Sequence, residues 1–347
     1  MKKLLIPLFS AAVLVSCGTA KIAERAPDQS SSSAKGDKAF LSAYKFIKAD
    51  ELKKNLYVIA SDEMGGRDTG SPGQKKAGEY MINYYKSLGI SYPKALGSYY
   101  QKVPAEFMKK RGGGNLPDSE NILAFIEGSE KPEEIVVISA HYDHVGTKDG
   151  VVYNGADDDG SGTVAVMQIA KAFQEAKKAG KGPKRSILFL HVTGEEHGLF
   201  GSDYYTSNPV FPLANTVVDL NIDMIGRDDP DNRGKQYVYV IGSEMLSSQL
   251  KVINEEANTK TNNLELNYKY DDPNDPQQLY YRSDHYNFAK NNVPVAFYFD
   301  GIHEDYHRPT DDPDKIDYPL LEKRTQLVFA TAWEIANRAE RIVVDKK

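Results

Sequence analysis

A His-x-Asp pair and a run of three aspartates lie close together near the middle of the chain. His141-Tyr-Asp143-His144 follows the apolar residues 135–140, and Gly-Ala-Asp-Asp-Asp-Gly-Ser-Gly occupies residues 155–162. A histidine with a carboxylate two residues away suits a metal ligand whose ring is held in one tautomer by a neighbouring acceptor. One such pair is often fortuitous, so the prediction of a metal site depends on matching ligands elsewhere in the chain.

Three further apolar runs end on acidic residues or histidine. Residues 186–192 lead into Gly194-Glu195-Glu196-His197, residues 217–222 lead into Asp223, and residues 293–299 lead into a loop that contains His307. Adjacent glutamates can divide the work, one binding metal and the other carrying protons. An aspartate that closes a buried strand must be paired, coordinated or protonated. Together these runs predict a shared site rather than four unrelated turns.

The elements that must position these residues alternate along the chain. Apolar runs predict strands over residues 121–127, 135–140, 186–192, 217–224, 237–241 and 293–299. Amphipathic spacing predicts helices over residues 72–88, 162–179, 246–258 and 284–290, and a last helix that buries Leu321, Val328, Ala332 and Ile335. The first two strands are joined by a short polar stretch and are expected to pair.

This alternation predicts an α/β fold with a mixed, mostly parallel central sheet and helices on both faces. The carboxyl ends of parallel strands meet at one edge, where such folds place their chemistry. The chain has 347 residues, 40% of them hydrophobic, and one catalytic domain over residues 39–347 is the simplest division. Its net charge of −6 and the lack of a basic block give no electrostatic case for nucleic-acid binding.

The first residues have the pattern of a signal peptide. Lys2 and Lys3 precede the apolar residues 4–15, a run too short to span a bilayer. Leu14-Val15-Ser16-Cys17 resembles the bacterial lipobox, which implies removal of residues 1–16 and lipidation of Cys17. The Ser-rich residues 17–38 then predict a flexible tether to a membrane of the bacterial cell envelope. The alternative is an ordinary signal peptide with a fortuitous cysteine.

Cys17 is the only cysteine of the chain. The protein therefore has no intrachain disulfide and no cysteine ligand for a metal ion. Any metal site must therefore use histidine and carboxylates.

Taken together, five motifs resemble the co-catalytic di-zinc aminopeptidases of the bacterial leucyl-aminopeptidase type, which are related to glutamate carboxypeptidases and glutaminyl cyclases. The motifs are, in order, His141-Tyr-Asp143, Gly155-Ala-Asp-Asp158, Gly194-Glu195-Glu196-His-Gly, Ile222-Asp223-Met and His307-Arg-Pro-Thr-Asp311. They cover most of residues 120–320. The resemblance implies a zinc-exopeptidase fold that hydrolyses the N-terminal bond of short peptides with a free N-terminus.

The resemblance also implies a set of metal ligands. Asp158 would bridge two metal ions, with His141 and Asp223 completing one site and Glu196 and His307 the other. Nitrogen and oxygen ligands without sulfur suit two Zn²⁺, with Co²⁺ or Mn²⁺ as possible substitutes.

The remaining motif residues would support the reaction. Glu195 would be the general base for a water shared by the metals. Asp143 would orient His141, and Asp311 would support the second site. Tyr280, or the tyrosine that follows it, would stabilise the oxyanion. The family also implies a cis peptide bond directly after the bridging aspartate.

Other interpretations stay open at this point. A carboxypeptidase-like dipeptide hydrolase needs a cation to bind a terminal carboxylate, and Arg227, Arg282 and Arg308 flank the motifs. Pairing of these arginines with nearby aspartates is the favoured explanation. A glutaminyl cyclase would use one zinc ion, which the full set of five ligands disfavours. A catalytically inactive binding domain is disfavoured because the ligands and the base are all present.

Overall fold

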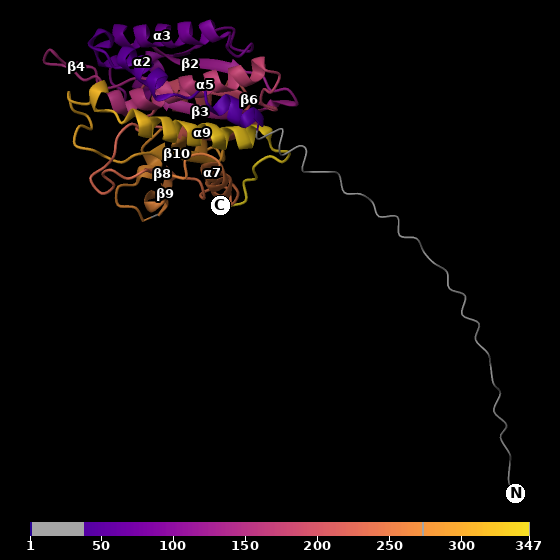
Figure 1. The fold of residues 1–347 in the computed structure, drawn as a ribbon. Coiled ribbons are helices and arrows are strands. Elements are labelled where there is room, and N and C mark those ends of the chain that lie inside the picture. Colours follow the sequence, from indigo (N-terminus) through magenta and orange to yellow (C-terminus); the bar gives the residue numbers. More distant parts are fainter. Residues whose placement is uncertain (2–37, 273, 347) are drawn as a thin grey trace.

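The computed structural model describes Met1 and residues 38–272 and 274–346 (Figure 1). The predicted signal peptide over residues 1–16 and the tether over residues 17–38 lie almost wholly outside the described residues. Within the part that is described, no helix is both long enough and apolar enough to cross a membrane.

An eight-stranded mixed sheet forms the centre of the molecule, in the order β1-β2-β6-β3-β7-β10-β8-β9 (Figure 1). Its strands are β1 (Tyr100–Val103), β2 (Ser119–Ile126), β3 (Lys131–His141), β6 (Arg185–Val192), β7 (Thr216–Ile222), β8 (Tyr237–Ile241), β9 (Glu265–Asn267) and β10 (Val295–Phe299). Strands β6, β3, β7 and β10 are parallel neighbours, and β1 and β2 run antiparallel to the strands beside them. β8 is antiparallel to β10 and parallel to β9. The predicted fold class is confirmed.

The predicted pairing of the first two strands, residues 121–127 and 135–140, is wrong. β6 lies between β2 and β3, antiparallel to the first and parallel to the second. Residues 127–130 connect β2 to β3 across the end of β6, a span of two strand spacings or about 9.6 Å. β6 is buried along its whole length, so its main-chain N–H and C=O groups need hydrogen-bond partners on both sides. A position between two strands provides them.

The helices are α2 (Ala49–Ile59), α3 (Pro72–Leu88), α4 (Ala105–Lys110), α5 (Gly162–Lys178), α6 (Phe200–Ser207), α7 (Leu250–Thr259), α8 (His285–Ala289) and α9 (Tyr318–Asn337). The two short strands β4 (Thr147–Lys148) and β5 (Val151–Val152) form a separate hairpin. The predicted start of α3 is confirmed, because the Ser71 side chain accepts a hydrogen bond from the Gln74 amide at 3.2 Å. α7 begins later than predicted, because the Leu246 carbonyl instead accepts the Asp345 amide at 3.1 Å.

Alternate residues of the central strands point to opposite faces of the sheet. Val136 and Ile138 of β3 belong to the large core formed with α2, α3, α5, α7 and α9. Val137 packs on the other face with Tyr205 of α6 and Phe288 of α8. Both faces are therefore covered, and chemistry is confined to the strand ends and the loops that follow them.

Asp219 is a buried carboxylate inside β7 and should make the stability of the protein depend on pH. The side chain accepts a hydrogen bond from Ser139 at 2.7 Å, and burial, with Asp284 nearby, raises the pKa of Asp219 to about 8. Between the ordinary pKa and pH 8 the unfolded chain loses this proton and the folded protein keeps it. The free energy of unfolding therefore falls as the pH rises through this window.

We expect Asp219→Asn to raise the free energy of unfolding at pH 7.5 by up to about 5 kcal/mol, since pH 7.5 lies nearly four units above the ordinary pKa of 3.8 and one unit corresponds to about 1.4 kcal/mol. Urea denaturation of the variant and the wild type at pH 5 and pH 7.5 measures the effect, and the gain should be smaller at pH 5. The exposed Asp231→Asn is the control and should change little. A gain of equal size at both pH values would contradict the assignment.

Candidate metal centre

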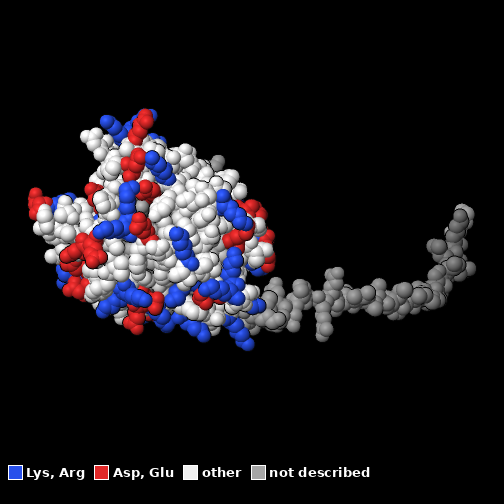
Figure 2. Space-filling view, turned by 90° about the horizontal axis from the view of Figure 1, so that it is seen from above, with Lys and Arg blue, Asp and Glu red and all other residues white. Residues whose placement is uncertain are grey.

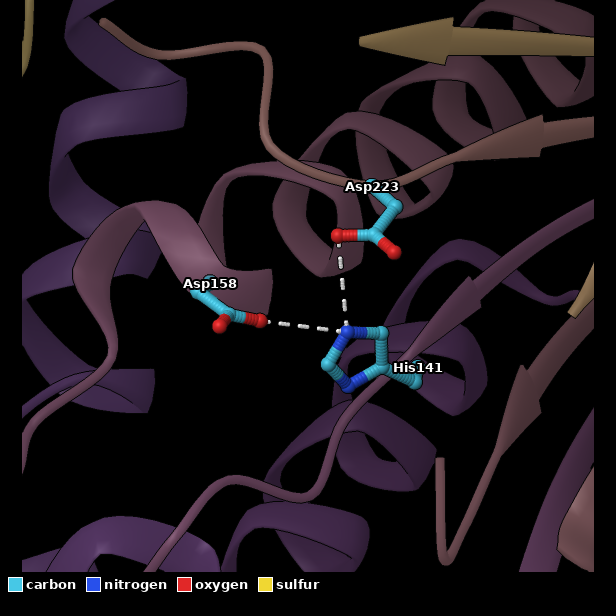
Figure 3. Close-up of side chains that lie close together, drawn as sticks. All are labelled: His141, Asp158 and Asp223. Atoms are coloured by element: carbon cyan, nitrogen blue, oxygen red, sulfur yellow. Dashed lines mark ion pairs between the residues drawn. The ribbon is translucent and has the colours of Figure 1, made fainter. Parts of the chain in front are cut away.

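Strand ends and one helix start bring three predicted ligands together (Figure 3). His141 is the last residue of β3, Asp223 directly follows β7, and Asp158 lies in the turn Ala156–Ser161 that precedes α5. His141 Nε2 lies 3.3 Å from Asp158 Oδ1 and 3.6 Å from Asp223 Oδ1. All three side chains are buried and form a group that could hold a metal ion.

A second group forms on the other oxygen of Asp158. His307 Nε2 lies 3.0 Å from Asp158 Oδ2 and 3.0 Å from Glu196 Oε2. Burial opposes a charge on His307, but the carboxylates of Asp158 and Glu196 outweigh it and raise its pKa to about 10. Asp158 therefore presents one oxygen to each group, the arrangement that a bridging ligand requires.

The residues fit a pair of metal ions. Ligand atoms about 2.0–2.1 Å from a tetrahedral Zn²⁺ lie about 3.3 Å from one another, and the distances in both groups are close to this value. The Nε2 atoms of His141 and His307 are buried and make no hydrogen bond with the described residues. Buried polar atoms of this kind normally have a partner, and a cation is the partner that carboxylates and imidazoles share.

The three consecutive aspartates have different surroundings. Asp157 accepts the Gly226 amide at 2.7 Å, and Asp159 accepts the amides of His141, Gly162 and Met224 at 2.9–3.2 Å. These two carboxylates tie neighbouring loops together, whereas Asp158 alone of the three faces His141 and His307. The predicted cis peptide bond between Asp158 and Asp159 is present.

The supporting contacts of His141 and Asp158 differ in part from the prediction. His141 Nδ1 lies 3.2 Å from the main-chain carbonyl of Asp143, while the Asp143 carboxylate is 3.7 Å away and accepts instead from Thr69 and the Glu195 amide. The predicted carboxylate contact is therefore replaced by a carbonyl contact, because the carboxylate is turned toward the glutamate loop. Asp311 accepts the Asp158 amide at 3.1 Å, and burial raises the pKa of Asp311 to about 6.

The adjacent glutamates point to different places. Glu196 is 4% exposed and lies within the second group, whereas Glu195 is 12% exposed and lines the pocket beside Asp158 and Asp223. Burial, with the charges of Asp223 and Glu196, raises the pKa of Glu195 well above its usual range. Glu195 is thus the glutamate that a molecule in the pocket would meet.

The pocket beside Glu195 combines charged residues with apolar side chains. Its lining includes Leu279, Phe297, Phe299, Ile302 and Tyr306. Tyr306, which the sequence interpretation missed although it directly precedes His307, stacks on the His307 ring with centroids 4.0 Å apart. Such a wall suits an apolar side chain of a substrate.

Tyr280, predicted to support the oxyanion, does not line this pocket. The short helix Leu279–Tyr281 turns it into a cluster with Tyr281, His285 and Tyr286, and it lines a separate pocket together with Tyr281. The ring of Tyr280 packs among these aromatic side chains, and its support of the oxyanion stays a prediction.

The three arginines near the motifs have different partners. Arg227 pairs with Asp305 at 3.0 Å, as favoured by the sequence interpretation. Arg282 lines the metal-site pocket and forms no ion pair with any residue that the structure describes. Arg308 also forms no ion pair with a residue in the described ranges. Its main-chain amide donates to the Asp305 carbonyl.

Two further residues lie at the site to which the sequence interpretation gave no role. Arg67 is fully buried and donates to the carbonyls of Ile59, Tyr142, Asn154 and Gly155 at 2.6–2.9 Å. His144 is fully buried beside Glu196. His144 was visible in the sequence next to the first motif, whereas nothing in the sequence marks Arg67.

The family is decided by the sequence match. Residues 121–332, more than half of the chain, match the sequence model of peptidase family M28. The chain belongs to peptidase family M28. The matched residues include all five predicted metal ligands and Glu195, so the recognised family resemblance is confirmed.

Among curated proteins, this M28 peptidase is similar to a probable zinc metalloprotease of Leptosphaeria maculans, with 34% identity over 35% of this chain and 27% of that protein. It also resembles a probable glutamate carboxypeptidase of Arabidopsis thaliana, with 33% identity over 30% of this chain and 14% of that protein. The matched stretch spans only about a quarter or less of these relatives.

The fold is shared with solved structures. The LapA aminopeptidase of Legionella pneumophila superposes with a TM-score of 0.67 over 95% of this chain and 81% of that chain, at 18% identity. The glutaminyl cyclase of Porphyromonas gingivalis superposes with a TM-score of 0.60 over 83% of this chain and 98% of that chain, at 19% identity. Enzymes of different reaction types therefore share this M28 fold, and the reaction must be argued from the site.

Proposed function

We propose that this M28 peptidase is a zinc-dependent aminopeptidase that hydrolyses the N-terminal bond of short peptides. The proposal is supported by the arrangement around Asp158. One carboxylate oxygen of Asp158 faces the group with His141 and Asp223, and the other faces the group with Glu196 and His307. These five residues would hold two Zn²⁺, and Co²⁺ or Mn²⁺ are chemically acceptable substitutes.

Two bound Zn²⁺ supply a Lewis acid for the scissile carbonyl and lower the pKa of the attacking water. Glu195, at the pocket side, takes a proton from that water and returns it to the leaving amine. The Asp143 carboxylate holds the Glu195 amide at 3.3 Å and so fixes the position of this base. The apolar wall formed by Leu279, Phe297 and other side chains would take the first residue of the peptide.

A carboxypeptidase-like dipeptide hydrolase is the second candidate, because one observation favours it. Arg282 lines the pocket without an ion-pair partner among the described residues, so its charge is free for a substrate carboxylate. The aminopeptidase is preferred because the five motifs together resemble the di-zinc aminopeptidases. The charges of Asp158 and Asp223 would be offset by the ions that they hold, so they do not decide between the two candidates. A glutaminyl cyclase with one zinc ion would leave part of this ligand set without a role. An inactive binding domain would do the same.

Substrate preference distinguishes the two candidates. We expect leucine p-nitroanilide to be hydrolysed with a kcat/KM about 10–150 times higher than that of its N-acetylated form, because a hydrogen bond to a charged group contributes about 1.5–3 kcal/mol. An N-acylated dipeptide should be poor, and Arg282→Met should leave p-nitroanilide hydrolysis unchanged. If the N-acylated dipeptide is the better substrate and Arg282→Met abolishes that preference, the protein is the carboxypeptidase-like hydrolase.

We also propose that the peptidase is attached to a membrane of the bacterial envelope through a lipid on Cys17. The support is the apolar run that ends at the only cysteine, followed by a Ser-rich stretch before the domain. On the face seen in Figure 2, basic and acidic side chains are intermixed rather than gathered in a basic patch. Attachment would therefore depend on the lipid and not on that face.

A further inference from the structure

We infer that Asn121 of β2 is a positioning residue that fixes the loop carrying Glu195. The glutamate loop comprises residues 193–201, between the end of β6 and the first turn of α6. This inference rests on the proposed function, since it concerns how the proposed general base is held in place. Asn121 lies outside the set of residues that line the metal-site pocket, so it would act through the loop and not on the substrate.

The Asn121 side chain holds both ends of the glutamate loop. It is 0% exposed, its Oδ1 accepts the Thr193 amide at 3.1 Å, and its Nδ2 donates to the Gly201 carbonyl at 2.9 Å. The same Nδ2 donates to Gln101 Oε1 of β1 at 3.0 Å, so both N–H donors of the side chain are used. The Thr193 amide can only donate and the Gly201 carbonyl can only accept, so the side-chain amide has a single orientation.

Glycine at position 201 allows the two ends of the loop to meet. The Gly201 amide donates to the Thr193 carbonyl at 2.7 Å. A Cβ at Gly201 would lie 2.3 Å from that carbonyl oxygen and 2.4 Å from Asn121 Oδ1. Any side chain at this position would therefore push the loop ends apart and away from Asn121.

Main-chain hydrogen bonds connect the loop ends to Glu195. The Glu195 carbonyl accepts the amides of Gly198 and Leu199 at 2.9 and 3.0 Å, and the Gly194 carbonyl accepts the Phe200 amide at 3.0 Å. The loop is therefore one hydrogen-bonded unit, and a shift of its ends should shift Glu195 with them.

Other buried side chains hold only the first end of the loop. Gln74 Nε2 donates to Thr193 Oγ1 at 2.7 Å, and Ser119 Oγ lies 2.7 Å from the same oxygen. All three side chains are 0% exposed. Among the side chains that the structure describes, only Asn121 forms hydrogen bonds with the main chain of both Thr193 and Gly201. The closure of the loop therefore depends on Asn121.

Asn121→Leu preserves the approximate size of the side chain and removes all three of its hydrogen bonds. A displacement of about 1 Å caused by a change remote from the chemistry can lower a rate by about 10²-fold. We therefore expect kcat for leucine p-nitroanilide to fall by about 10²-fold. KM should change little, because binding of the substrate does not require proton transfer. Saturating Zn²⁺ and the measured zinc content show that the loss of kcat is not a loss of metal.

Combination with Glu195→Gln separates positioning of the base from general damage to the fold. In the Glu195→Gln background, Asn121→Leu should lower kcat by less than about threefold, because the base that it positions is already absent. An equal loss of kcat in both backgrounds would overturn the inference, and so would a wild-type kcat for Asn121→Leu alone.

Asn258→Leu is the matched control for removing a buried amide that holds a loop. Asn258 accepts the Leu264 amide at 2.9 Å and donates to the Leu264 carbonyl at 2.8 Å. Its loop, between α7 and β9, carries none of the proposed site residues. The control should leave kcat unchanged.

Gly201→Ala tests the same closure from the main-chain side and replaces Asn121→Leu if that variant does not fold. Its methyl group would enter the contact with Asn121 Oδ1, and the loss of kcat should again depend on Glu195. If the wild type hydrolyses leucine p-nitroanilide and neither variant shows a loss that depends on Glu195, the inference is wrong and the proposed function stands. If the wild type hydrolyses no aminoacyl p-nitroanilide, the proposed function is wrong and the inference falls with it.

Discussion

Replacing Glu195 by glutamine is expected to lower kcat by about 10²–10⁴, the usual contribution of a positioned general base. The change preserves size and removes only the proton acceptor, so both metal ions should stay bound. KM should change little, because binding of the substrate does not require that proton transfer. The measurements are steady-state kinetics on leucine p-nitroanilide and the zinc content of the purified variant.

Glu196→Gln is the matched comparison, since the neighbouring glutamate lies inside the second ligand group and is less exposed. It removes an anionic ligand, so it should first lower the zinc content, and added Zn²⁺ should restore part of the activity. Added Zn²⁺ should not rescue Glu195→Gln. If Glu195→Gln loses metal and Glu196→Gln keeps both ions, the two roles are exchanged.

Replacing Arg67 by methionine is expected to lower the free energy of unfolding by about 3–5 kcal/mol, the typical cost of removing one partner from a buried charged network. Arg67 is fully buried and donates to four main-chain carbonyls, each of which would lose its donor. Methionine has a similar length but no donor, so packing changes less than hydrogen bonding does.

The Arg67 substitution should also reduce metal affinity, because two of those carbonyls belong to the loops that carry His141 and Asp158. Urea denaturation and zinc titration measure the two effects. Arg233→Met is the control, since Arg233 is 66% exposed and its ion pair with Glu304 is a surface contact. A stable Arg67→Met variant with normal zinc affinity would show that the loops are held without this arginine.

Local patterns predicted the layered architecture well. The alternation of apolar runs and amphipathic segments identified the buried strands and most helices near the site, because burial imposes a period on the sequence. The pairing of β2 with β3 was wrong because sheet order depends on which distant strand fills the space between them, and β6 does so. A short connection between two strands does not by itself determine that they are neighbours.

The positions of the principal site residues could also be predicted. His141, Asp223 and Glu196 follow strands that are parallel neighbours, and such strands end at the same edge of the sheet. The sequence alone therefore determined the fold class, the family and the residues that converge.

The tertiary structure decided how those residues face one another. Which aspartate points at the histidines, which group of Asp143 reaches His141 and whether Tyr280 enters the pocket all depend on turns outside the strands. These turns are held by Arg67, Asp157 and Asp159 through hydrogen bonds between residues far apart in the chain. Such contacts leave no periodic pattern in the sequence, and so only the folded molecule shows them.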